Sequence, residues 1–137
     1  MGADRFDNLV KTGALRAEPP HEAELAQLMD SAIARLSDAE RDDLSFDSRF
    51  DLAYNASHAL ATVALRRRGY RPTNRYVVFQ ILGETAGLET SAWRVLAAAH
   101  EKRNVAEYEG ALDHDPQLLV DMIRITRELA ARLASRK

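Results

Sequence analysis

The placement of proline and glycine constrains the fold of this chain more than any other feature of its sequence. Proline occurs only at Pro19, Pro20, Pro72 and Pro116, and glycine is also sparse. The long stretches between these positions are dominated by Ala, Leu, Arg and Glu, which favour helix. The sequence therefore predicts an all-α fold, a bundle of four main helices with short helices added.

Helix boundaries follow from caps and stops. Ser45 is a good N-cap, and Gly69, Gly87 and Gly110 are natural C-terminal stops. The segment ALRAEPP reads as a loop, and no segment reads convincingly as a strand, although YVVFQIL is rich in β-branched residues. We expect one domain over residues 1–137, with 1–20 as an N-terminal arm containing a short helix, and helices over 3–12, 21–36, 46–68, 75–86, 92–109 and 116–135.

Composition excludes several classes of function. The absence of cysteine excludes disulfides, thiolate nucleophiles and cysteine zinc sites. The net charge of −2 argues against broad affinity for nucleic acid or anionic membranes. No secretory signal pattern or membrane-length apolar run is present, so we expect a cytoplasmic protein without membrane contact. One local concentration of basic residues remains, and it could contact RNA backbone or simply cap a helix: Arg66, Arg67, Arg68, Arg71 and Arg75, with Tyr70 and Tyr76 between them.

A polar group lies on an otherwise apolar face of the helix predicted over 92–109. At 100° per residue, His100, Asn104 and Tyr108 share a face with Trp93 and Leu96. Buried Asn and His side chains need hydrogen-bond partners. The flanking pair Arg103 and Glu107 is spaced four residues apart and can form an ion pair.

The helix predicted over 46–68 offers partners for this group. Its polar stripe contains Asp47, Asp51, Asn55 and His58. One interpretation is a satisfied polar network that fixes helix register. The other is a cleft that binds a phosphate-bearing ligand through Arg103 and Asn104. The stripe lacks the converging ligands of a metal centre, so we predict no metal and no cofactor.

Three stretches resemble the HEPN superfamily (higher eukaryotes and prokaryotes nucleotide-binding domain). They are LVKTGALRAEPP, SRFDLAYNASHALATVALRRRGYRPTNRYVVFQ and AHEKRNVAEYEG, the last with the pattern RN-x-x-EY-E-G. The resemblance implies an antiparallel helical bundle that dimerises. Many HEPN proteins are RNases of toxin–antitoxin or defence systems, and others are non-catalytic partners of nucleotidyltransferases.

The catalytic pattern of the family is Arg, usually followed by a polar residue, with His after a further four to six residues. Arg103 and Asn104 match its start, but the next histidine is the distant His114. Catalytic candidates are therefore Arg103, His100 and Tyr108, and tyrosine is a weak acid at neutral pH. The resemblance implies a homodimer associated with RNA or nucleotide. Two alternatives stay open: an RNase toxin with an altered active site, and a non-catalytic partner of an antitoxin or nucleotidyltransferase.

Overall fold

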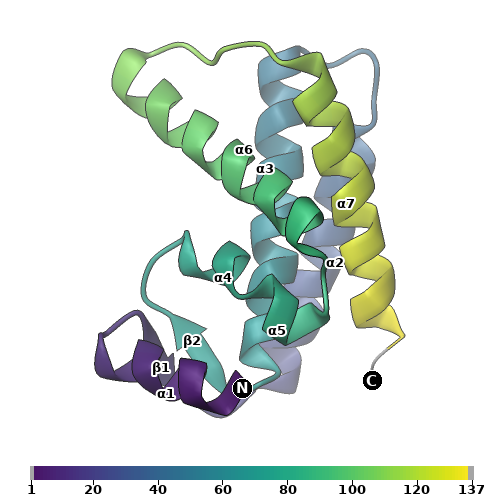
Figure 1. The fold of residues 1–137 in the computed structure, drawn as a ribbon. Coiled ribbons are helices and arrows are strands. Elements are labelled where there is room, and N and C mark those ends of the chain that lie inside the picture. The colour runs from purple at the N-terminus through teal and green to yellow at the C-terminus, as the bar shows by residue number, and fades with distance from the viewer. Residues whose placement is uncertain (1, 136–137) are drawn as a thin grey trace.

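The computed structural model describes residues 2–135 and shows an all-α fold, as the sequence predicts. Four long helices dominate it (Figure 1). They are α2 (Glu22–Ala39), α3 (Phe46–Arg66), α6 (Thr90–Glu109) and α7 (Pro116–Ala134). The smaller elements are α1 (Gly2–Lys11), β1 (Leu15–Ala17), β2 (Tyr70–Pro72), α4 (Val77–Gln80) and α5 (Leu82–Ala86).

Helix α3 lies at the centre of the molecule and packs against α2 and α7 (Figure 1). It begins where the sequence predicts, because the Ser45 side chain accepts a hydrogen bond from the Ser48 backbone N–H at 3.1 Å. Its buried surface is rich in small side chains, which allow neighbouring helices to approach closely. The buried alanines of α3 are Ala53, Ala56, Ala59, Ala61 and Ala64.

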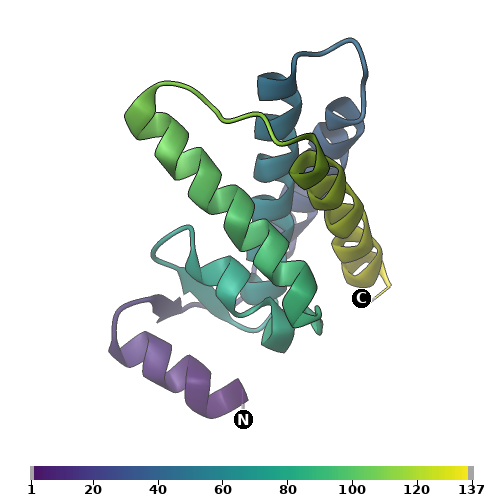
Figure 2. The ribbon, with the colours of Figure 1, turned by 45° about the horizontal axis from the view of Figure 1, so that its top comes forward.

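Helix α6 crosses the α3–α7 layer obliquely rather than running along it (Figure 2). Its N-terminal half packs near α4 and α5, and its C-terminal half runs in the direction of the N-terminal end of α3 while diverging from that helix (Figure 1). The connection 110–115 then returns to the start of α7. This geometry leaves the last turns of α6 partly open to solvent, with Val105 and Tyr108 exposed.

The segment predicted as one helix over 75–86 is instead two short helices, α4 and α5, separated at Ile81. The Asn74 side chain caps the first, accepting hydrogen bonds from two backbone N–H groups. The break has a physical reason. Five of the six residues from 77 to 82 are buried, and one straight helix cannot direct nearly consecutive side chains toward one core. These residues are Val77, Val78, Phe79, Ile81 and Leu82.

The expectation that no strand forms is wrong, because β1 and β2 pair antiparallel, with Leu15 opposite Pro72 and Ala17 opposite Tyr70. The reason lies partly in Arg66, whose side chain is fully buried beneath this pairing. Its guanidinium donates to the carbonyls of Glu18, Pro19 and Tyr70 at 2.8, 2.7 and 3.3 Å. A single buried cation thus fastens the segment after β1 to the start of β2.

Two carboxylates balance this buried charge. Glu24 Oε1 lies 3.1 Å from Arg66 Nε, and Glu18 Oε2 lies 3.5 Å from Arg66 Nη2. Arg71 pairs with both carboxylates, at 2.7 and 3.0 Å. Hydrogen bonding by Arg71, assisted by Arg16 and by the charge of Arg66, lowers the pKa of Glu18 to about 2. This network gives two residues of the basic run, Arg66 and Arg71, a structural role within the fold.

Candidate functional site

A chain of hydrogen bonds joins α3 to α6 where the two helices cross. The Oη atom of Tyr54 lies 2.9 Å from His100 Nδ1, and His100 Nε2 lies 3.0 Å from Asn104 Nδ2. Tyr54 is completely buried and His100 nearly so. His100 and Asn104 meet because they are one helical turn apart on α6. Tyr54 reaches them from the middle of α3.

These contacts define the proton positions on His100. The amide nitrogen of Asn104 only donates hydrogen bonds, so Nε2 of a neutral His100 accepts. The ring hydrogen is then on Nδ1 and is donated to the hydroxyl oxygen of Tyr54. Burial lowers the pKa of His100, and nearby Arg75 and Arg103 act in the same direction. The imidazole is therefore neutral near pH 7.

Two arginines flank the ring of Tyr54. The guanidinium carbon of Arg103 lies 4.9 Å from the ring centroid and that of Arg75 lies 5.5 Å from it. Such contacts are attractive, because the face of an aromatic ring is electronegative. Arg75 also donates to the Tyr54 hydroxyl at 3.3 Å and to Asn55 Oδ1 at 3.4 Å. Two positive charges thus meet at one buried phenol.

The two arginines differ in how their charge is balanced. Arg103 pairs with Asp51 at 3.3 Å and with Glu107 at 2.9 Å, the latter as the spacing of four residues predicts. Arg75 forms no ion pair within residues 2–135, and its partners are neutral. An anion that approaches Arg75 therefore meets a guanidinium without a competing carboxylate.

His58 belongs to the same group. Its ring lies 5.9 Å from Phe79 in an edge-on arrangement, and its Nε2 atom is buried without a hydrogen-bond partner. Burial lowers the pKa of His58 to about 4, and the charges of Arg75 and Arg103 add to the effect. This imidazole is also neutral at pH 7, so the net charge of the group is determined by its two arginines and by Asp51 and Glu107.

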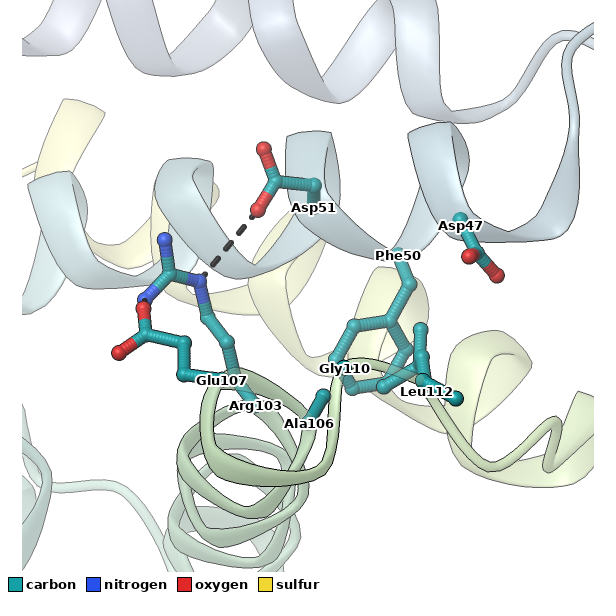
Figure 3. Close-up of a pocket in the computed structure, with 9 residues that line it drawn as sticks. Asp47, Phe50, Asp51, Arg103, Ala106, Glu107, Gly110 and Leu112 are labelled. Carbon is teal, nitrogen blue, oxygen red and sulfur yellow. Dashed lines mark hydrogen bonds and ion pairs between the residues drawn. The ribbon is translucent and has the colours of Figure 1, made fainter.

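A cavity of about 340 Å³ adjoins the group and opens between α3, the last turns of α6 and the following loop. Such a volume is at the lower end for small-molecule sites. Figure 3 shows Arg103 with Asp51 and Glu107 at one end of the cavity, and Asp47, Phe50 and Leu112 at the other. The remaining lining residues are Ala106, Gly110 and Ala111.

The structure brings together most of the residues singled out from the sequence. His100 and Arg103 contact α3, Asn104 contacts His100, and Asp51 and Asn55 contact the two arginines. Asp47 and Glu107 line the cavity. His58 lies beside Tyr54, with ring centroids 6.4 Å apart.

The expectation that Tyr108 faces inward is wrong, because Tyr108 is 94% exposed. The oblique path of α6 explains this, because its last turns diverge from α3 (Figure 2). His100 is therefore buried against α3, whereas Tyr108, on the same face of α6 but two turns later, is exposed. Three residues of the basic run, at the end of α3 and just after it, have partners within the fold. Arg66 is buried, Arg67 donates to the Leu133 carbonyl, and Arg68 donates to the Glu84 carbonyl.

Sequence reasoning missed two central residues. Tyr54 belongs to neither the polar stripe of the helix predicted over 46–68 nor the group on the next long helix, yet a buried tyrosine needs a partner for its hydroxyl. Arg75 stood in the basic run, but its position beside Tyr54 depends on the turn between β2 and α4. The one available signal was a tyrosine four residues before His58 on α3, a spacing that places both on one helix face.

The described part of the chain contains neither a cluster of metal ligands nor a membrane-spanning helix. Among residues 2–135, no group of three or more His, Asp or Glu side chains is placed to hold a metal ion. No helix in this range is both long enough and apolar enough to cross a bilayer. Comparisons with protein-family models, curated proteins and solved structures found no match for the chain.

Proposed function

We propose that this protein is a HEPN-like helical protein that binds a phosphate-bearing ligand, RNA or nucleotide, beside Tyr54. The proposal rests on one observation: Arg75 and Arg103 flank the same ring, and Arg75 has no carboxylate partner among the described residues. Guanidinium groups bind phosphate oxygens with paired N–H donors, and such charge-assisted bonds are strong.

The neutral groups around the arginines complete such a site. Asn55 and Asn104 offer amide groups for ribose or phosphate oxygens. His58 and His100 are neutral, so they add no charge that must be compensated when the ligand is absent. The family resemblance further suggests a homodimer in a toxin–antitoxin or defence system. Val105 and Tyr108, exposed at the end of α6, are available for contact with a second chain.

Binding of a labelled single-stranded RNA, followed by fluorescence anisotropy, tests the proposal. Arg75→Gln should weaken binding about tenfold or more, because it removes a charge-assisted bond to phosphate. It should also reduce the salt dependence by the contribution of about one phosphate contact. Arg94→Gln is the matched control, since Arg94 is exposed on α6 and has no partner within residues 2–135. Equal binding by the two variants, or no binding by the native protein, would refute the proposal.

A second candidate function, RNA cleavage, has a specific observation in its favour. A general base for the ribose 2′-hydroxyl must be neutral and have an accessible lone pair. His58 is neutral and no hydrogen bond occupies its Nε2 atom, but that atom is buried, so cleavage by this base requires the site to open around the RNA. Cleavage of RNA that persists in EDTA and disappears in both Arg103→Ala and His58→Gln would support this function. Absence of cleavage by a folded protein that binds RNA would leave binding alone.

A further inference from the structure

We propose that the end of the cavity next to Asp47 is a nucleobase subsite that prefers guanine. This inference rests on the proposed function, because it requires the phosphate of the same ligand to lie near Arg75 and Arg103. The cavity itself points in this direction. It runs from Arg103 at one end to Asp47 and Phe50 at the other (Figure 3).

The lining of the two ends differs in chemistry. Arg103 and its carboxylate partners occupy one end, whereas the partly exposed Leu112 provides apolar surface at the other, where the buried Phe50 also lies. A nucleotide has a comparable division between a charged phosphate, which would displace Asp51 or Glu107 from Arg103, and a flat, largely apolar base. The apolar end also carries one polar group, Asp47, whose side chain is 62% exposed and so is accessible to a ligand.

Asp47 is held in place by the loop that follows α6. His114 Nε2 lies 2.7 Å from Asp47 Oδ1, and the ring of His114 stacks on Phe46 with centroids 4.4 Å apart. Oδ2 of Asp47 has no hydrogen-bond partner within the described residues. An oriented carboxylate with a free oxygen beside an apolar surface is suited to receive N–H donors.

The chemistry of the carboxylate selects among the bases. An ionised carboxylate only accepts hydrogen bonds. Guanine presents two adjacent donors, the N1–H and the 2-amino group. In uracil the N3–H is flanked by two carbonyl acceptors, and the amino groups of adenine and cytosine each lie beside a ring-nitrogen acceptor. Only guanine therefore avoids placing an acceptor against Asp47.

Competition experiments with mononucleotides test this inference. GMP, AMP, CMP and UMP would each displace the labelled RNA, with ribose 5-phosphate reporting the phosphate subsite alone. We expect GMP to bind about tenfold more tightly than UMP, the effect of charge-assisted hydrogen bonds set against repulsion between acceptors. Asp47→Asn should bring the GMP to UMP ratio close to one while leaving ribose 5-phosphate unchanged.

Asp43→Asn provides the matched control, because Asp43 is equally exposed, pairs with Arg41 and does not line the cavity. Asp47 makes no contact with Arg103, so its substitution leaves the phosphate end intact. If ribose 5-phosphate binds but the four nucleotides bind equally, the guanine subsite is refuted and the phosphate site stands. If GMP preference survives in Asp47→Asn, the subsite is also refuted. If neither nucleotide nor ribose 5-phosphate binds, the proposed function fails, and the subsite with it.

Discussion

Replacing Arg66 by methionine should destabilise the protein strongly, because Met has an apolar stem of similar length and removes all hydrogen-bond donors. Arg66 is fully buried and serves two carboxylates and three backbone carbonyls. Breaking a buried ion pair typically costs about 3–5 kcal/mol. The expected loss is near the lower limit, about 3 kcal/mol, because Glu18 and Glu24 are each about 30% exposed and retain Arg71 as a partner.

Urea denaturation followed by circular dichroism measures this loss. With a typical dependence of about 1–3 kcal/mol per molar urea, the midpoint should fall by roughly 1–3 M. Arg71→Met is the control, since Arg71 pairs with the same carboxylates but is 30% exposed, and such pairs contribute only about 0–1 kcal/mol. Equal losses in the two variants would refute the reasoning that burial, rather than the ion pairs alone, makes Arg66 essential.

Two further predictions concern the candidate site. Tyr54→Phe leaves Nδ1 of His100 buried without its partner, so the free energy of unfolding should fall by about 1–3 kcal/mol in the same assay; a change below about 0.5 kcal/mol would contradict the hydrogen-bonded chain. The pKa of His58 is about 4 in the folded protein against an ordinary 6.5, so the unfolded chain binds its proton first. Stability should therefore fall as pH decreases from 6.5 to 4, and His58→Gln should reduce the fall, most clearly above pH 5, before carboxylates titrate; an unchanged pH profile would be contrary to this assignment.

Features set by local chemistry were predictable from the sequence. Ser45 caps α3 and Gly87 and Gly110 end their helices in the left-handed conformation, because these preferences depend on one or two residues. The Arg103–Glu107 pair followed from helical spacing alone. Periodicity likewise placed His100 toward the core.

Features set by distant neighbours were not predictable in this way. The outward position of Tyr108 depends on the crossing angle of α6, which no local pattern encodes. The strands are three residues each and exist only because residues 15–17 meet residues 70–72. In the sequence Arg66 looks like any arginine at the end of a helix, although its side chain is completely buried in the structure. Arg75 and Tyr54 came together through a turn whose geometry the sequence leaves unspecified.

The pairing of β1 with β2 also orders events during synthesis. More than fifty residues separate the two strands, and ribosomes add about 5–20 residues per second. The N-terminal arm must therefore wait several seconds, until β2 has left the ribosome, before it can dock. During that interval Leu15 and Phe6, both buried in the finished protein, are exposed to chaperones and to other nascent chains. The arm is made before α3 but can reach its native position only after α3 is complete.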